Sequence, residues 1–72
     1  MNETQFKNDL MCCKALIFVE DYGIRWYRCM ILGVNDRGEY HVRRIRTGQE
    51  AITTQVRNLT DKDRKYLRNN YL

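Results

Sequence analysis

The stretch that decides the fold is Trp-Tyr-Arg-Cys-Met-Ile-Leu-Gly-Val at residues 26–34, the densest apolar segment, which contains the only Trp of the chain. Its β-branched, aromatic and sulfur-containing side chains are typical of a β-strand. Apolar side chains occupy both alternating faces, with Trp26, Met30, Leu32 and Val34 on one and Tyr27, Cys29 and Ile31 on the other. A flat, half-exposed strand would alternate more cleanly. The pattern therefore predicts a long, curved central strand of a small β-barrel.

Four shorter segments predict the other strands of this barrel, at residues 14–19, 39–45, 50–54 and 55–59. Turn signals separate the first three from their neighbours, at residues 20–23, 35–38 and 46–49. Gly23 and Gly38 supply the positive φ angles that tight turns need. Short strands joined by tight turns favour an antiparallel barrel over a parallel sheet.

The two ends of the chain are predicted to lie outside the barrel, which spans residues 14–60. Thr60 is a suitable cap for a short helix at residues 61–72, because its hydroxyl can accept a hydrogen bond from a free N–H group. Asp61 and Asp63 suit the positive end of that helix dipole. Residues 1–13 form a polar arm, in which Phe6 and Leu10 are spaced for a short helix; an unstructured arm is the alternative.

The length of the chain, 72 residues, limits it to one domain with a small core. A binding surface is therefore expected rather than an elaborate active site. The longest uninterrupted apolar run, residues 15–19, is too short for a membrane helix. The first five residues lack the features of a secretory signal. We therefore expect an intracellular protein without a membrane partner.

The three cysteines and the single histidine predict neither a metal site nor a catalytic centre. Cys12, Cys13 and Cys29 show no Cys-x-x-Cys spacing, and with His41 they make an improbable zinc set. Reduced, partly buried thiols fit the expected compartment. The chain contains no Ser, and His41 has no orienting group in view. No enzymatic activity and no cofactor are expected.

Charge is unevenly distributed along the chain. Residues 1–36 contain four Lys or Arg against five Asp or Glu, whereas residues 37–72 contain nine against four. The second half is therefore a candidate for binding an anionic partner. The candidate binding residues are eight of the nine basic residues of that half: Arg37, Arg43, Arg44, Arg46, Arg57, Lys62, Lys65 and Arg68. A solvated arginine-rich strand, with ion pairs to Glu39 and Glu50, is the alternative.

Four short motifs together resemble a Tudor-like domain of the SH3-like barrel class. They are Ala-Leu-Ile-Phe-Val-Glu-Asp at 15–21, Trp-Tyr-Arg-Cys at 26–29, Thr-Gly-Gln-Glu at 47–50 and Val-Arg-Asn-Leu at 56–59. In that family, similar motifs form the first strand, the start of the second, a later turn and the closing strand. The resemblance covers residues 14–61 and implies a five-stranded antiparallel barrel. Sm-like chains are a second, more distant resemblance within the same small-barrel class.

The family's aromatic cage is incomplete in this sequence. Tudor domains that read methylated Lys or Arg surround the cation with aromatic rings. The resemblance places Phe18 and Tyr27 at cage positions, and Trp26 and Tyr22 are further rings for an aromatic pocket. Residues 45–47 are Ile-Arg-Thr where the family has rings and an Asn, and an arginine there would repel a methylated cation. The resemblance therefore supports the fold and argues against that activity.

Two binding functions remain as hypotheses. The first is a module that binds nucleic acid through the arginine-rich face, where Arg groups hold phosphates and aromatic rings stack on bases. The alternative is a protein-interaction module or small regulator, because an acidic protein surface would satisfy the same arginines.

Overall fold

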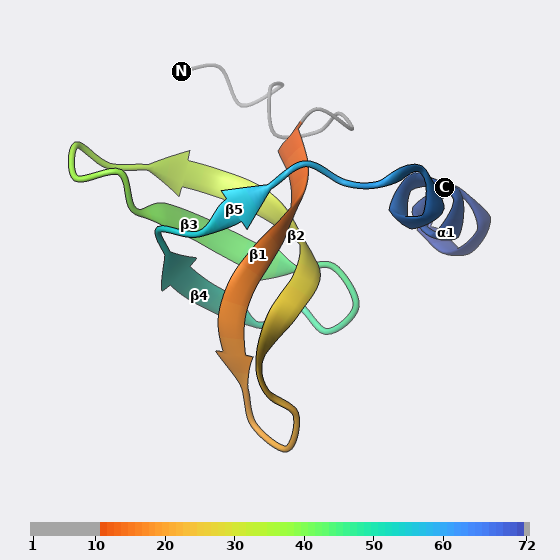
Figure 1. Ribbon diagram of the computed structural model, residues 1–72, viewed down its shortest axis with the longest axis horizontal. Helices are drawn as coiled ribbons and strands as arrows, with labels where there is room; N and C mark the ends of the chain where they lie inside the picture. The colour runs from red at the N-terminus through yellow and green to blue at the C-terminus, as the bar shows by residue number, and fades with distance from the viewer. Residues whose placement is uncertain (1–10, 72) are drawn as a thin grey trace.

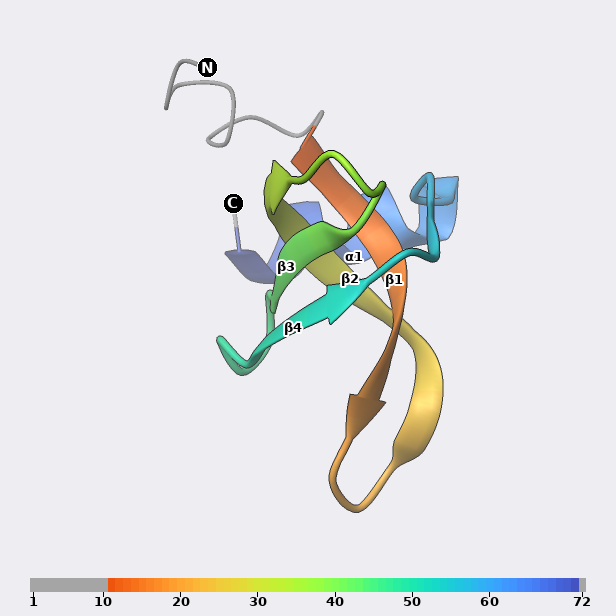
Figure 2. The ribbon, with the colours of Figure 1, turned by 90° about the vertical axis from the view of Figure 1, so that its left-hand side faces the viewer.

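The computed structural model describes residues 11–71 and shows one antiparallel sheet with a C-terminal helix. The strands are β1 (Cys12–Val19), β2 (Gly23–Val34), β3 (Tyr40–Arg44), β4 (Glu50–Thr53) and β5 (Val56–Arg57), and the helix is α1 (Asp61–Tyr71). The strand order is β4-β3-β2-β1-β5, and the sheet curls into a half-barrel (Figures 1 and 2). The mainly β class, the five strands and the C-terminal helix are confirmed. This architecture is compatible with an SH3-like barrel.

β2 is the central strand, as predicted, and it is longer than the apolar pattern indicated. It begins at Gly23, three residues before Trp26, because the hairpin with β1 continues to the turn. In that turn Tyr22 N–H donates to the carbonyl of Val19 (3.0 Å), and Asp21 adopts a positive φ of 76°. Where β2 pairs with β3, the register shifts between Ile31 and Gly33, which forms a bulge in β2. Bulges increase local twist and bending, which fits the curved path of β2.

The core lies on the inner face of the curled sheet. β1 buries alternate residues, and the buried cluster consists of Cys13, Ala15, Ile17, Val19, Cys29 and Val42. β1 therefore starts at Cys12, two residues before the predicted position, because Cys13 joins the core. The other face of β1 carries Lys14, Leu16 and Phe18. The remainder of the predicted arm, residues 1–10, lies outside the described residues.

The helix begins where the sequence indicated. Asp63 N–H donates to the hydroxyl oxygen of Thr60 (3.1 Å), and Thr60 N–H donates back to Asp63 Oδ2 (3.0 Å). This reciprocal pair is a capping box with Asp in the place of the usual Glu. The predicted fifth strand is reduced to two residues, Val56–Arg57, before the chain turns toward α1. Among residues 11–71, no helix has the length and apolar character of a membrane span.

Candidate functional site

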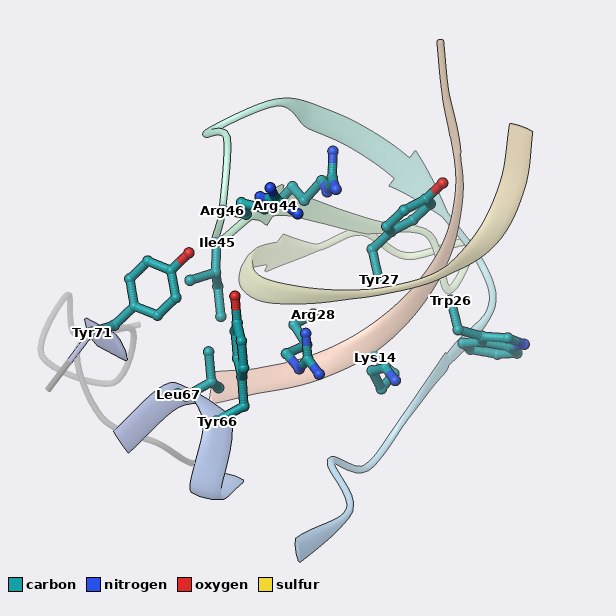
Figure 3. A pocket seen from close by; sticks show the side chains of 10 residues that line it. All are labelled: Lys14, Trp26, Tyr27, Arg28, Arg44, Ile45, Arg46, Tyr66, Leu67 and Tyr71. Atoms are coloured by element: carbon teal, nitrogen blue, oxygen red, sulfur yellow. The ribbon is translucent and has the colours of Figure 1, made fainter. Parts of the chain in front are cut away.

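A groove lies between the free edge of β2 and the helix α1. β3 pairs with β2 only from Cys29 onward, so the first part of β2 has β1 on one side alone. One further backbone hydrogen bond joins β2 to the loop that follows β3, from Ile45 N–H to the carbonyl of Arg28 (3.1 Å). The groove has a volume of about 240 Å³ (Figure 3). Its walls are Lys14, Trp26, Tyr27, Arg28, Arg44, Ile45, Arg46, Tyr66, Leu67 and Tyr71.

The composition of these walls is basic and aromatic. Four of the ten lining residues carry a positive charge, four carry an aromatic ring, and none carries a carboxylate. Hereafter this feature is called the basic groove. Such a surface attracts anions through its charge and offers flat rings for stacking.

Asp63 links the helix to the sheet beside the basic groove. Its Oδ1 accepts a hydrogen bond from Arg28 Nε (3.0 Å) of β2 and lies 3.3 Å from Lys14 Nζ of β1. Lys14 and Arg28 are directly opposite each other in the register of the two strands, so one carboxylate can reach both. Burial pushes the pKa of Asp63 up, but the hydrogen bonds from Thr60 and the charge of Lys14 outweigh it, and its pKa falls to about 2. The ionised carboxylate therefore fixes two cations on the groove wall.

Aromatic rings hold the guanidinium groups of the groove in place. Arg28 lies over the ring of Tyr66, 4.0 Å from its centroid, and the ring of Tyr71 lies 6.2 Å from that of Tyr66. Arg44 lies over the ring of Tyr27 at 4.5 Å. The hydroxyl of Tyr27 donates to the carbonyl of Gly23 (3.2 Å), which fixes that ring. These contacts pre-organise the cations for a ligand.

Arg44 and Arg46 are the cations of the groove that have no carboxylate. Arg44 is only 9% exposed, and Arg46 is exposed at the rim. Within the described part of the chain, no Asp or Glu pairs with either side chain. Both line the groove, Arg44 from the last position of β3 and Arg46 from the turn that follows it. Among the described residues, the charge of these two arginines is therefore not compensated by a carboxylate.

The other predicted basic residues lie outside the groove. Arg57 of β5 stacks on Trp26, 3.8 Å from the ring centroid, beside one end of the groove. Arg43 points away from the groove and pairs with Glu50 (3.2 Å), as the alternative interpretation of the arginine-rich strand required. Arg37 is exposed in the turn between β2 and β3. Lys62, Lys65 and Arg68 are exposed on α1.

The rings of the predicted aromatic pocket are not brought together. Tyr27 packs toward the core opposite Ala15, whereas Phe18 is 63% exposed on the other face of the sheet. Trp26 shares that outer face, and Tyr22 is exposed in the β1–β2 turn. Neighbouring residues of a strand point to opposite faces, so Trp26 and Tyr27 could not both face one cage from the same surface. Both line the basic groove, and Figure 3 shows them on opposite sides of the β2 ribbon.

Six of the ten groove residues were not among the predicted site residues: Lys14, Arg28, Ile45, Tyr66, Leu67 and Tyr71. Lys14 and Arg28 belong to the less basic half of the chain, and Tyr66 and Tyr71 lie in the predicted helix, outside the predicted barrel. One local signal was available, since Thr-x-x-Asp at residues 60–63 marks a buried or capping carboxylate that needs a counter-charge.

The thiols of Cys13 and Cys29 are buried on neighbouring strands and directly opposite each other. Burial raises the pKa of Cys13 to about 12 and that of Cys29 to about 11, although the charge of Arg44 lowers the latter. Both therefore stay protonated and behave as core residues. Within residues 11–71, no group of three or more His, Cys, Asp or Glu side chains is placed to hold a metal ion.

Comparison with known proteins finds no matching family model, no similar curated protein and no similar solved structure. The functional argument therefore depends on the geometry of the groove.

Proposed function

We propose that this chain is a non-enzymatic binding module, a Tudor-like member of the SH3-like barrel class, that binds nucleic acid in the basic groove. One observation supports this most strongly: Arg44 and Arg46, two arginines without a carboxylate partner in the described part of the chain, share the groove with four aromatic rings. Arg guanidinium groups bind phosphate oxygens in a bidentate manner. Aromatic rings stack on bases, and phosphate and base occur together in nucleic acids.

The same walls argue against the methylated side chains that the Tudor resemblance would suggest. A trimethyl-lysine or methyl-arginine is cationic and would meet Lys14, Arg28, Arg44 and Arg46. Moreover, Arg guanidinium groups already cover one face of Tyr27 and one face of Tyr66. The groove therefore selects against cations through its charge.

A salt-dependent binding assay tests this function. Fluorescently labelled DNA and RNA, each single- and double-stranded, are titrated with the protein at about 50 mM and 200 mM salt. We expect affinity for at least one of them at the lower salt and a steep loss at the higher, because bound phosphates release counterions. No binding to any of them at the lower salt contradicts the proposal.

A pair of single substitutions then assigns the site. R46A removes an exposed groove cation, and R43A is its matched control, since Arg43 is only two residues away but points away from the groove. R46A should weaken binding and reduce the salt slope by about one, the amount expected for one lost phosphate contact. Equal effects of R46A and R43A would place the binding surface elsewhere.

A second candidate function, docking on another protein, is favoured by the exposed end of the β1–β2 hairpin. Phe18 and Ile24 are directly opposite each other there, 63% and 67% exposed, and Tyr22 in the turn is 56% exposed. Exposed apolar clusters of this kind often mark protein contacts. A photo-crosslinking amino acid at position 24, compared with one at position 37, tests this in nuclease-treated extract of the native host. A single dominant protein captured only from position 24 would favour docking over nucleic-acid binding.

A further inference from the structure

The floor of the basic groove carries a buried charge that no carboxylate within residues 11–71 neutralises. Arg44 is 9% exposed, its guanidinium is 4.5 Å from the ring centroid of Tyr27, and no carboxylate of the described residues pairs with it. Removing a charge from water without a counter-ion is costly. An anion that reaches the floor would recover part of that cost, whereas an anion held at the rim would contact only Arg46.

The rim of the groove carries an exposed ring at its helical end. Tyr71 is 45% exposed, and its ring is tilted by 56° to that of Tyr66. Arg28 covers one face of Tyr66, so Tyr71 is the more accessible ring of this pair. Figure 3 shows Tyr71 and Trp26 at opposite ends of the groove, with Arg44 and Arg28 between them.

Building on the proposed function, we infer that the groove takes a single strand of nucleic acid, with one backbone phosphate on Arg44 and an unpaired base stacked on Tyr71. In a duplex the bases stack on one another and show only their edges in the grooves. A duplex also keeps its phosphates on a convex surface, which can meet Arg46 but not the recessed Arg44. A single strand can turn a phosphate inward and a base outward at the same nucleotide.

The size of the groove limits how much of the strand it encloses. Its volume of about 240 Å³ is below the roughly 300–1,000 Å³ of pockets that enclose drug-sized ligands. One nucleotide unit therefore enters, and its neighbours follow the surface toward Trp26 and Arg57. Phosphate and base are common to RNA and DNA, so both kinds of strand belong in the test.

The first experiment compares strands with duplexes. Ten-nucleotide labelled oligo-dT and oligo-U, and duplexes of the same length, are titrated by fluorescence anisotropy at about 100 mM salt. We expect at least one single strand to bind ten times more tightly than either duplex. Equal or tighter binding of the duplexes overturns the inference but leaves the proposed function standing. No binding to any of the four, at this salt or at 50 mM, overturns the proposed function itself.

The second experiment tests the stacked base. Y71A should weaken the binding of the preferred strand by about tenfold, within the range measured for loss of one base–ring stack. Y22A is the matched control, since Tyr22 is also an exposed tyrosine but lies at the β1–β2 turn, and it should bind as the parent does. An oligomer of the same length without bases should bind less well than the normal strand to the parent, and about equally well to Y71A. A Y71A protein that keeps the full preference for bases overturns the inference.

The third experiment tests the recessed phosphate. R44K keeps the positive charge but loses the planar fork, and R44Q keeps hydrogen-bonding groups but loses the charge. We expect R44Q to weaken strand binding at least tenfold and R44K to be intermediate, with both variants checked for the parental circular dichroism spectrum. If R44Q fails to fold, R46A is measured in its place. Arg46 is exposed at the rim, so R46A should weaken duplex and single-strand binding alike. A folded R44Q with parental affinity overturns the inference.

Discussion

Two carboxylates in this molecule each bridge two basic side chains, and they differ chiefly in burial. Asp63 is 3% exposed between α1 and the sheet, where it holds Lys14 and Arg28. Glu50 lies on the outer face of the sheet, where it contacts His41 (2.8 Å) and Arg43 (3.2 Å). Both have a pKa below the ordinary value. The Asp63 bridge fixes two cations of the groove wall, whereas the Glu50 bridge joins exposed side chains of β3 and β4.

The sheet and the helix are stabilised by different forces. The buried cluster of the sheet is apolar, so its contribution does not depend on charge. The helix, with eleven residues, is too short to be stable alone and is docked through Asp63, Tyr66 and Leu67. The groove has one wall from each part, and its shape therefore depends on a single ion-pair cluster.

The largest effect should come from breaking the buried bridge. D63A removes a carboxylate that two cations and the Thr60 cap share, and it leaves Lys14 and Arg28 half-buried without a counter-charge. We expect a loss of about 3 kcal/mol, at the lower end for a broken buried pair. Native-state hydrogen exchange should show that the amides of α1 lose protection while those of β1–β3 keep theirs.

The matched control for this change is D61A. Asp61 is also acidic and in the first turn of α1, but it is exposed and its contact with Arg64 is long, at 3.5 Å. It should have little effect. If D63A and D61A destabilise the helix equally, the helix dipole rather than the buried bridge holds it.

Acid should reproduce the effect of D63A in the unchanged protein. The folded-state pKa of Asp63, about 2, lies below the ordinary 3.8, so its stabilisation is fully present above about pH 4. That stabilisation, about 2 kcal/mol for a shift of this size, is lost as the pH falls through 2. Denaturant unfolding between pH 5 and pH 2 should show this loss in the parent and a smaller one in D63A. Parallel pH profiles would contradict the role given to Asp63.

A smaller effect is expected from the cap alone. In T60A the hydroxyl that accepts from Asp63 N–H (3.1 Å) and donates to Asp63 Oδ2 (2.9 Å) is lost, but the ion pairs remain. The cost should be about 1 kcal/mol in denaturant unfolding, as for other helix caps. T60S keeps the hydroxyl and should recover most of that stability. If T60S is as unstable as T60A, packing of the methyl group is responsible.

Much of the fold could be predicted because its signals are local. The apolar run at residues 15–19, the turn glycines and the Thr60 cap each depend on a few neighbouring residues. The starts of β1 and β2 were misplaced because pairing between the two strands extends both of them toward earlier residues, whereas their last residues, Val19 and Val34, agree with the prediction. The bulge in β2 was not predicted either, since it depends on register with β3.

The groove was harder to predict because its residues come from four separate parts of the chain. Arg44 and Arg46 could be predicted from composition, but the same reasoning included Arg43, which faces the other way. Lys14 and Arg28 became groove residues only through the strand register that places them together under Asp63. Tertiary packing decides which face of a curled sheet a helix covers, and no local pattern in the sequence indicates that face.

The smallest effect should come from the exposed bridge. E50Q removes the charge that His41 and Arg43 share, but all three side chains are about half exposed, so water replaces what the carboxylate provided. We expect no measurable change in the denaturant midpoint, and the same small sensitivity to salt in parent and variant. D63N is the counterpart at the buried site, since it makes the same chemical change. If E50Q were as destabilising as D63N, sharing of one carboxylate by two cations would be sufficient for stabilisation. Burial would then not be the property that makes the Asp63 bridge more stabilising than the Glu50 bridge.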